Sequence, residues 1–316
     1  MIPALVLTAG SGTRLRPLSL VRAKAAMPVA GEPLARRILR QLHAAGVRDV
    51  VLNLHHLPHT ITREVGDGSD LGLCARYSWE MPVLGSAGGP RQALPLLGEA
   101  ACLIVNGDTL TGVDVGALAA EHRRTGALVT MAVVPNGEPE KYGGVLVDAD
   151  GAVTGFTRRG SSDRSHHFVG VQVANADGFA SVSPGAAAES VGSLYPMLIR
   201  TQPGSVRTFV TDAAFLDIGT PEDYLQTSLR LAAGNGAALR GARTRVDPAA
   251  RIEDTVLWDD VEVGPGASLR RSVVADNVSI PAGTTWADVA VRRAGGPLAP
   301  AERRIGDLAV APIHVS

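Results

Sequence analysis

The stretch Ala4-Leu-Val-Leu-Thr-Ala-Gly-Ser-Gly-Thr-Arg-Leu-Arg-Pro-Leu18 decides the fold class, because a short apolar run stops at a cluster of glycines. This pattern predicts a buried strand over residues 4–8 that feeds a loop. Apolar residues at helical spacing then occupy residues 33–45, and Gly46 suits the C-terminal cap of that helix. Residues 49–54 form a second apolar run and predict another strand. Strand, helix and strand in this order form a βαβ unit, in which the two strands are parallel.

The same alternation continues through the first 230 residues. It predicts strands at residues 74–78, 102–106 and 128–134, helices at 90–97 and 115–125, and antiparallel strands between 145 and 173. Thr220 followed by Pro221 predicts the start of a further helix. Only 4% of the residues are aromatic, so the core rests on aliphatic side chains, as in parallel sheets covered by helices. The predicted class is α/β, with a mixed, mostly parallel sheet.

A repeat begins after the small residues 232–237, which are typical of a linker. The stretch that starts at Val246 returns 17 residues later at Val263, and again 17 residues later at Ile280. Apolar residues also recur six apart, which is the hexapeptide pattern of a parallel β-helix. We therefore expect a domain over residues 1–234 and a short β-helix over 240–292. The tail, 293–316, gives no clear signal.

Composition excludes several classes of function. Lysine and arginine number 30 against 31 acidic residues, a balance that does not favour binding to nucleic acid or to a membrane surface. No apolar stretch approaches the ~20 residues of a membrane span, and no signal peptide opens the chain, so we expect a cytoplasmic protein. Cys74 and Cys102 lie in apolar runs, where we expect buried thiols rather than a disulfide.

The loop after the first strand carries Gly10 and Gly12, so its backbone amides can approach a phosphate closely. Its spacing matches neither the dinucleotide fingerprint nor the P-loop. Arg14 and Lys24 add cations near the end of a strand, where open α/β sheets bind ligands. A structural tight turn and a solvated basic surface remain the alternatives for this loop.

Several motifs in one order resemble the sugar-phosphate nucleotidyltransferases, which are also called nucleoside-diphosphate-sugar pyrophosphorylases. The quoted stretches are Leu7-Thr-Ala-Gly-Ser-Gly-Thr-Arg-Leu-Arg-Pro-Leu18, Lys24, Pro28-Val29, Leu84-Gly-Ser-Ala-Gly88-Gly, Val105-Asn-Gly-Asp108 and Phe215-Leu-Asp217-Ile-Gly-Thr-Pro-Glu-Asp-Tyr224. The resemblance covers about residues 2–231. It implies a Rossmann-like, GT-A-like catalytic domain followed by a left-handed parallel β-helix, which many members share.

The resemblance also implies roles for individual residues. The nucleotide would be bound by Leu7, Ala9, Gly10, Gly12, Thr13 and Gly88. Arg14 would hold the departing phosphates, and Lys24 would lie near the α-phosphate. Asp108 and Asp217 are similar to the family's magnesium ligands, and carboxylates suit Mg²⁺, which prefers hard oxygen ligands. Capping of the next element is the alternative role for both acids.

The resemblance is weaker on the sugar side. Family members commonly carry Glu-Lys-Pro after Gly-Phe, whereas this chain has Gly155-Phe-Thr-Arg-Arg-Gly160. Arg159 can still bind the sugar's phosphate, and we assign Gly144 to the same subsite. The absence of the glutamate removes an acceptor for sugar hydroxyls, so the resemblance does not identify the sugar. The nearby pair His166 and His167 is read as ordinary strand or loop residues, and no zinc site is expected at His55 and His56.

The resulting hypothesis is a transferase that joins a nucleoside triphosphate to a sugar 1-phosphate with Mg²⁺ and releases pyrophosphate. It is similar to mannose-1-phosphate guanylyltransferases. The alternatives are a uridylyltransferase acting on glucose, N-acetylglucosamine or N-acetylmuramate 1-phosphate, and a nucleotide-sugar-binding regulatory subunit with weak activity. The flat faces and exposed edges of a β-helix favour a homo-oligomer.

Overall fold

The computed structural model describes residues 2–98 and 100–314, and these fall into two compact units. The first unit consists of the N-terminal segment up to Gly10, of Arg36–Pro58 and of Val65–Leu216. The second consists of Ser11–Ala35, His59–Glu64 and the chain from Asp217 onward. The glycine-rich loop is therefore divided, and its second half belongs to the same unit as the C-terminal repeats.

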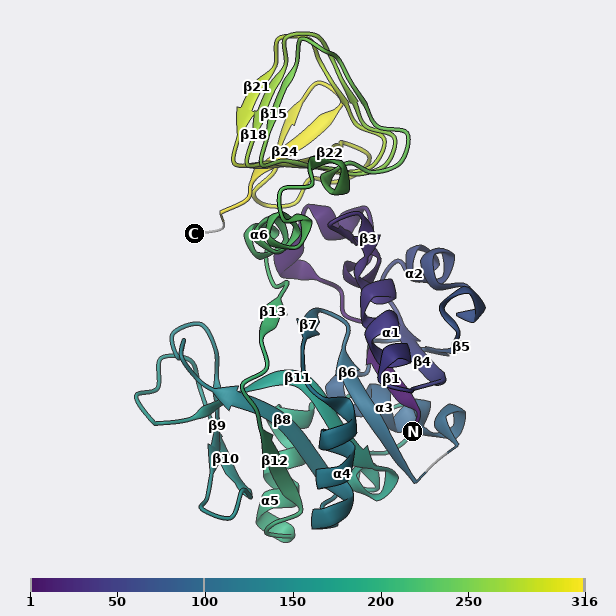
Figure 1. The fold of residues 1–316 in the computed structure, drawn as a ribbon, viewed down its shortest axis with the longest axis vertical. Coiled ribbons are helices and arrows are strands. Elements are labelled where there is room, and N and C mark those ends of the chain that lie inside the picture. The colour runs from purple at the N-terminus through teal and green to yellow at the C-terminus, as the bar shows by residue number, and fades with distance from the viewer. Residues whose placement is uncertain (1, 99, 315–316) are drawn as a thin grey trace. The chain divides into compact units, whose positions relative to one another are not determined.

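A nine-stranded mixed sheet forms the centre of the first unit (Figure 1). Its main order is β10-β9-β11-β6-β1-β4-β5, with β8 paired to β11 and β12 paired to β8. The bounds are β1 Ala4–Leu7, β4 Asp49–Leu54, β5 Cys74–Trp79, β6 Ala101–Asn106, β8 Val129–Pro135, β9 Gly144–Val147, β10 Val153–Thr157, β11 His166–Asn175 and β12 Val206–Val210.

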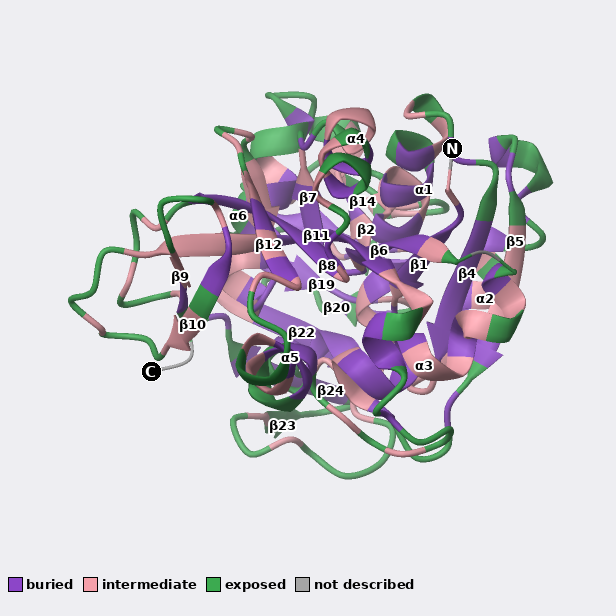
Figure 2. Ribbon diagram, turned by 90° about the horizontal axis from the view of Figure 1, so that it is seen from below, coloured by how far each residue is buried: buried purple, intermediate pink, exposed green. Residues whose placement is uncertain are grey.

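The pairing confirms the predicted βαβ unit, because β1 runs parallel to β4 and to β6. The predicted antiparallel region is also confirmed, since β9, β10 and β11 pair antiparallel. Central strands are buried on both faces, whereas most residues of the edge strand β5 are partly or fully exposed (Figure 2). This edge position corrects the expectation for Cys74, which is free but exposed, while Cys102 on the central β6 is free and buried.

Six α-helices accompany the strands in the described residues: α1 Leu34–Ala44, α2 Pro58–Val65, α3 Gly85–Leu97, α4 Val115–Thr125, α5 Tyr195–Thr201 and α6 Pro221–Ala232. The start of α6 is a capping box, in which Thr220 and Asp223 bond each other's backbone amides, as the sequence predicts. None of the helices that the described residues form is long and apolar enough to span a membrane.

Helix α3 begins five residues before the predicted start at residue 90. Its first turns carry several glycines and contain Pro90, and these residues have low helix propensity. Packing overrides propensity here, because a Cβ on Gly88 would overlap the Ala186 carbonyl oxygen. The glycines thus allow the helix to lie against the chain at residues 186–188.

The second unit ends in a three-faced β-helix, drawn in green to yellow in Figure 1. Its faces are β14-β17-β20, β15-β18-β21 and β16-β19-β22, all parallel. The bounds are β14 Arg245–Val246, β15 Arg251–Glu253, β16 Val256–Leu257, β17 Glu262–Val263, β18 Ser268–Arg270, β19 Val273–Val274, β20 Ser279–Ile280, β21 Thr285–Ala287 and β22 Val289–Arg293. Val246, Val263 and Ile280 are register partners, so the 17-residue repeat is confirmed as one coil.

The C-terminal tail, for which the sequence gives no clear signal, has regular structure. Strands β23 Arg303–Ile305 and β24 Leu308–Pro312 form a hairpin that extends the third face, with β24 antiparallel to β22. Leu308 and Val310 join the apolar interior of the coils. The linker prediction is also modified, because residues 236–239 form a short 3-10 turn capped by the Asn235 side chain. Two further ribbons pair β2 Pro28–Val29 with β3 Glu32–Pro33, and β7 Thr109–Thr111 with β13 Phe215–Asp217.

Candidate active site

The first half of the glycine-rich loop is held by a buried asparagine. Oδ1 of Asn53, near the end of β4, accepts hydrogen bonds from the Thr8 amide at 2.6 Å and from the Ala9 amide at 3.3 Å. The Thr8 hydroxyl donates back to the Asn53 carbonyl. These amides are therefore already bonded within the protein, and Gly10 is the first exposed position of the loop.

A buried carboxylate extends this network to helix α3. Glu80 is 3% exposed. Its Oε1 accepts from Asn53 Nδ2 and its Oε2 from the Leu84 amide, both at 2.7 Å. Asn53 and Glu80 were missed in the sequence, although an asparagine inside an otherwise apolar, buried strand is a usable signal. The pair connects the two segments that the sequence assigns to the nucleotide.

The second half of the loop, in the second unit, is shaped by Gly12. Its φ of +58° lies in the left-handed region, and a Cβ there would come within 3.1 Å of the Ser19 side chain. The Gly12 carbonyl accepts from the Leu15 amide at 2.9 Å and from the Ser19 hydroxyl at 2.7 Å. The resulting 3-10 turn leaves Thr13 and Arg14 exposed and buries Leu15.

Arg14 and Asp217, which are 203 residues apart in the chain, lie beside the same glycine in the second unit. A Cβ placed on Gly219 would be 3.4 Å from Asp217 Oδ2 and 3.5 Å from an Arg14 guanidinium nitrogen. Asp223, the capping residue of α6, lies 3.2 Å from the same point. The structure thus brings together one predicted phosphate ligand and one predicted metal ligand.

Lys24 opens a 3-10 turn over Lys24–Ala26, and its side chain is partly exposed. The residues that flank it, Ala23 and Ala25, are buried. The Ala23 amide donates to Thr60 Oγ1 at 3.1 Å. The backbone of Lys24 is therefore fixed while its ammonium-bearing chain reaches the surface.

Asp108 follows strand β6 in the first unit and lies next to the loop's first residue. The preceding Gly107 donates its amide to the Leu7 carbonyl at 3.0 Å, and a Cβ on Gly107 would overlap that oxygen. Thr109 Oγ1 donates to Asp108 Oδ1 at 3.2 Å. Only glycine permits this close approach, so the sequence Gly107-Asp108 places a carboxylate-bearing residue beside the C-terminal end of β1.

The donor set fits magnesium in its chemistry. Asp108, which follows β6, and Asp217, the last residue of β13, each supply a partly exposed carboxylate, and magnesium is usually held by one or two carboxylates together with phosphate oxygens. Among the described residues no group of three or more His, Cys, Asp or Glu side chains is arranged to hold a metal alone. A magnesium ion at either carboxylate would therefore also need phosphate oxygens of a substrate as ligands.

Gly88 has a packing role in the structure. It is buried inside α3, and its amide donates to the Ala188 carbonyl at 3.2 Å. Its Cα and the rest of the turn from Leu84 are held against residues 186–188. Its contact with a nucleotide stays a prediction, and its own amide is already engaged.

On the sugar side, Gly144 and Arg159 differ sharply in their surroundings. Gly144 is buried at the start of β9, its amide donates to Thr157 Oγ1 at 3.0 Å, and a Cβ would overlap the Ser165 hydroxyl. Arg159 lies in the exposed loop after β10. Within residues 2–98 and 100–314 its guanidinium makes no ion pair, so it is available to an anion.

An aromatic cluster that was not predicted contains Tyr142, which is two residues before Gly144, together with His167 and Phe215. The ring of His167 lies 4.1 Å from that of Tyr142 and 5.0 Å from that of Phe215, measured between centroids. The pKa of His167 is lowered to about 4, chiefly by burial and in smaller part by the charge of Lys141, while a hydrogen bond with Gly143 acts in the opposite direction. His167 is therefore a neutral ring at pH 7, and it lies in strand β11, one of the two ordinary positions expected for it.

The remaining histidines have ordinary positions. His166 begins β11 beside His167. His55 Nδ1 lies 3.0 Å from the Glu80 carbonyl oxygen, which holds that ring at the end of β4. His55 and His56 are both partly exposed.

Comparison with known proteins agrees with these features. The family described as nucleotidyl transferase matches residues 3–234, and the family described as GlmU-like, C-terminal hexapeptide matches residues 236–287. A mannose-1-phosphate guanylyltransferase of Mycobacterium tuberculosis is 32% identical over 294 residues, which are 89% of this chain and 82% of the relative. An N-acetylmuramate α-1-phosphate uridylyltransferase of Neisseria meningitidis is 45% identical over 113 residues, or 35% of this chain and 48% of the relative.

The fold also matches solved structures. The crystal structure of HddC from Yersinia pseudotuberculosis superposes with a TM-score of 0.65 and 22% identity, over 73% of this chain and all of that chain. At this identity the match supports the fold alone. The matched families, the relative that spans both parts of the chain and the ordered motifs lead to one conclusion: this chain belongs to the sugar-phosphate nucleotidyltransferases, with a hexapeptide-repeat β-helix at its C-terminal end.

Proposed function

We propose that this enzyme is a mannose-1-phosphate guanylyltransferase, which makes GDP-mannose and pyrophosphate from GTP and mannose 1-phosphate. We base this choice on the relative named as a mannose-1-phosphate guanylyltransferase. Its similarity covers 89% of this chain, and therefore both the nucleotidyl transferase match and the hexapeptide repeats. The uridylyltransferase with 45% identity is similar over 113 residues only, and supports the second candidate, uridylyl transfer to a sugar 1-phosphate.

The proposed reaction is an in-line displacement at the α-phosphorus. An oxygen of the sugar phosphate forms a bond to that phosphorus while the bond to the β-phosphate oxygen breaks, and pyrophosphate leaves. No general base is needed, because the attacking oxygen already bears negative charge. The obstacle is repulsion between two anions: unit charges ~4 Å apart interact by about 4 kcal/mol at an effective dielectric near 20.

The chain's own cations would lower this repulsion. Arg14 would hold the departing phosphates and Lys24 the α-phosphate, so that both act where charge accumulates in the transition state. Arg159 would hold the phosphate of the sugar. Arg14 is supported by its position beside Asp217, and Arg159 by the absence of an ion pair for it among the described residues.

Members of this family generally use a divalent metal such as Mg²⁺, and Asp108 and Asp217 are the residues that would hold it here. When bound, the ion supplies positive charge that screens the phosphate oxygens. We propose residues 1–234 as the catalytic domain and 240–292 as the β-helix. The β-helix has outer strand edges at β14 and β15, which support self-association into a homo-oligomer. Sedimentation velocity of the full chain tests that assembly.

A panel experiment tests the proposed function. The full chain is incubated with Mg²⁺ and each of GTP, UTP, ATP, CTP and dTTP against the 1-phosphates of mannose, glucose, N-acetylglucosamine and N-acetylmuramate, and pyrophosphate release is recorded. The highest kcat/KM is expected for GTP with mannose 1-phosphate. A maximum with UTP selects the second candidate. Binding without turnover across the panel would contradict both and identify a regulatory subunit.

A further inference from the structure

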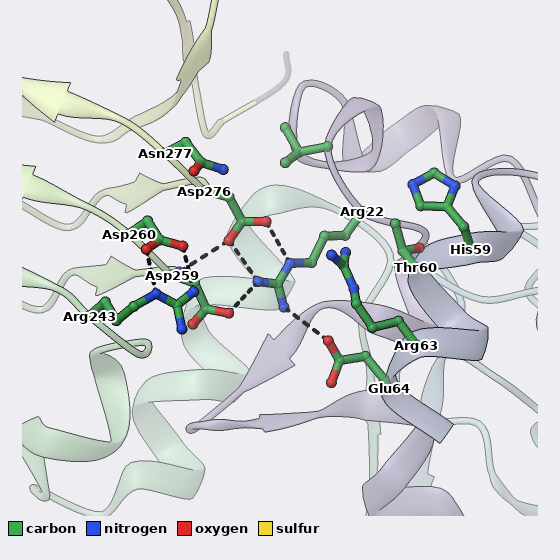
Figure 3. Close-up of a pocket in the computed structure, with 11 residues that line it drawn as sticks. Arg22, His59, Thr60, Arg63, Glu64, Arg243, Asp259, Asp260, Asp276 and Asn277 are labelled. Carbon is green, nitrogen blue, oxygen red and sulfur yellow. Dashed lines mark hydrogen bonds and ion pairs between the residues drawn. The ribbon is translucent and has the colours of Figure 1, made fainter. Parts of the chain in front are cut away.

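Arg22, two residues before Lys24, is held by the β-helix within the second unit. Its Nε and one terminal nitrogen donate to the two carboxylate oxygens of Asp276, both at 2.7 Å (Figure 3). The same terminal nitrogen donates to Asp259 Oδ2 at 2.7 Å. The Arg22 side chain is only 7% exposed. A charged side chain so deeply buried is tolerated because its partners are fixed.

The two acids are themselves positioned by the coils. Asp259 and Asp276 occupy equivalent positions, 17 residues apart, in successive coils. Asp276 Oδ1 accepts from the Asp259 amide at 3.1 Å, and Asp259 Oδ1 accepts from the Ala242 amide at 2.8 Å. The carboxylates therefore form a ladder whose orientation is set by the β-helix backbone, and Arg22 binds to that ladder.

A third side chain of the β-helix, Trp258, packs near the Arg22 guanidinium. The guanidinium carbon lies 5.5 Å from the ring centroid of Trp258, which is fully buried. Glu64 lies 3.8 Å from the remaining terminal nitrogen. Burial lowers the pKa of Arg22, but the hydrogen bonds and charges of Asp276 and Asp259 raise it more, so the net shift is upward. Arg22 is a permanent cation among carboxylates.

The segment is fastened at its other end as well. The Tyr224 hydroxyl donates to the Pro28 carbonyl and accepts from Trp258 Nε1 at 2.8 Å. Both rings are fully buried. Between the two ends the chain makes one 3-10 turn, with the Ala26 amide bonded to the Ala23 carbonyl at 2.8 Å. Lys24 therefore lies in a short segment that is held at Arg22, near Trp258, and at Pro28, through Tyr224.

We propose that Arg22 is a positioning residue for nucleotidyl transfer, which uses the aspartate ladder of the β-helix to place the segment that carries Lys24. The β-helix then contributes to the reaction without touching substrate. This inference rests on the role of Lys24 in the proposed function. Displacing a reacting group by about 1 Å can cost ~10²-fold in rate, so a loosened anchor acts on turnover more than on ground-state binding.

The same region contains a matched control. Arg243 and Asp260 form a second arginine–aspartate pair, joined by two hydrogen bonds of 2.6 Å (Figure 3). They and Arg22 line one cavity of about 350 Å³. Both residues belong to the coils, 17 positions apart, and their fork does not include the segment 22–28. The two arginine–aspartate pairs have the same chemistry, and only the pair with Arg22 holds the segment that carries Lys24.

The test compares Asp276→Asn with Asp260→Asn in the full chain. Asp276→Asn places an amide donor against a guanidinium donor, and is expected to lower kcat at least tenfold while KM for the triphosphate and the sugar phosphate stays within about twofold. Asp260→Asn is expected to leave kcat unchanged. Arg22→Lys, which keeps the charge but loses the fork, should give an intermediate kcat. Wild-type kcat in Asp276→Asn and Arg22→Lys, or an equal loss in Asp260→Asn, overturns the proposal.

A second readout does not depend on turnover. Amide hydrogen exchange in the peptide that contains Ala26 and Met27, whose amides close the turn around Lys24, is expected to quicken in Asp276→Asn and not in Asp260→Asn. Unchanged exchange in Asp276→Asn contradicts the positioning role even if the wild-type enzyme transfers no nucleotide. If the wild-type enzyme transfers no nucleotide and exchange still quickens in Asp276→Asn, the result counts against the proposed function and not against the positioning role of Arg22.

Discussion

The glycine-rich loop region, around Thr8, and the proposed sugar-phosphate region, around Arg159, are built in opposite ways. In the loop region, the Thr8 amide, Asn53 and Glu80 form one buried, fully bonded network, and glycines allow backbones to meet. In the sugar-phosphate region, Arg159 lies on an exposed loop and His167 forms part of a partly exposed ring cluster. A rigid frame suits the chemistry shared by a family, and exposed loops suit features that vary, such as the sugar.

The largest expected effect is on the chemical step. Asp108→Ala removes a proposed metal ligand and is expected to lower kcat by at least ~10³-fold, because several kcal/mol of charge stabilisation are lost. The matched control is Asp114→Ala, which removes the N-cap of α4. That control should cost about 1 kcal/mol of stability and leave kcat intact. Pyrophosphate release and thermal unfolding measure both, and equal kcat values would refute the assignment of Asp108.

The second prediction concerns the frame of the loop. Asn53→Ala removes the acceptor for the Thr8 amide and leaves Oε1 of buried Glu80 without its donor, so the free energy of unfolding should fall by about 2–4 kcal/mol. KM for the triphosphate should rise while KM for the sugar phosphate stays constant. Denaturant titration and steady-state kinetics check this. A rise in both KM values would show that the two regions are not independent.

The third prediction addresses the sugar-phosphate region. Arg159→Ala is expected to raise KM for the sugar 1-phosphate about tenfold, the magnitude of one charge-assisted contact, with KM for the triphosphate unchanged. Arg164→Ala provides the control, because Arg164 is also exposed and its side chain has no ion pair in the part of the chain that the structure describes. An identical response of the two variants would mean that Arg159 is solvated surface.

The smallest effect is a pH dependence of stability. The pKa of His167 is about 4 in the folded chain, below the ordinary value of 6.5. Between these values the unfolded chain binds more protons, so the contribution is full above about pH 6.5 and is lost as pH falls toward 4. His167→Phe should therefore lose less stability than wild type between pH 7 and pH 5 in urea titrations. His59→Gln, at an exposed position of α2, is the control. A wild-type pH slope in His167→Phe contradicts the neutral ring.

Local patterns account for what the sequence predicted well. The bounds of β4 and α4, the capping box at Thr220 and the 17-residue coils all follow from spacing along a few residues. The start of α3 was missed because its glycines are selected by packing against residues 186–188, which no local propensity records. Cys74 was expected to be buried because an apolar run does not reveal which strand lies at the edge of a sheet.

The candidate site was predictable only in its residue types. The sequence names Arg14 and Asp217 separately, and folding is required to bring them to Gly219. Asn53 in β4 and Glu80, which follows β5, are 27 residues apart, and Arg22 and Asp276 are 254 apart, so their pairing depends on tertiary structure. The proposed roles of these residues in binding and catalysis stay predictions that the variants above examine.

The most direct test of the central claim follows the α-phosphate. GTP labelled in that position is incubated with mannose 1-phosphate and Mg²⁺, using the wild-type chain and Lys24→Ala. We expect wild type to transfer label to the nucleotide sugar in equal amounts with pyrophosphate. We expect Lys24→Ala, with an unchanged unfolding midpoint, to transfer label at least ~10³-fold more slowly. Transfer by Lys24→Ala at the wild-type rate, or label released from wild type only as GMP, would contradict these expectations.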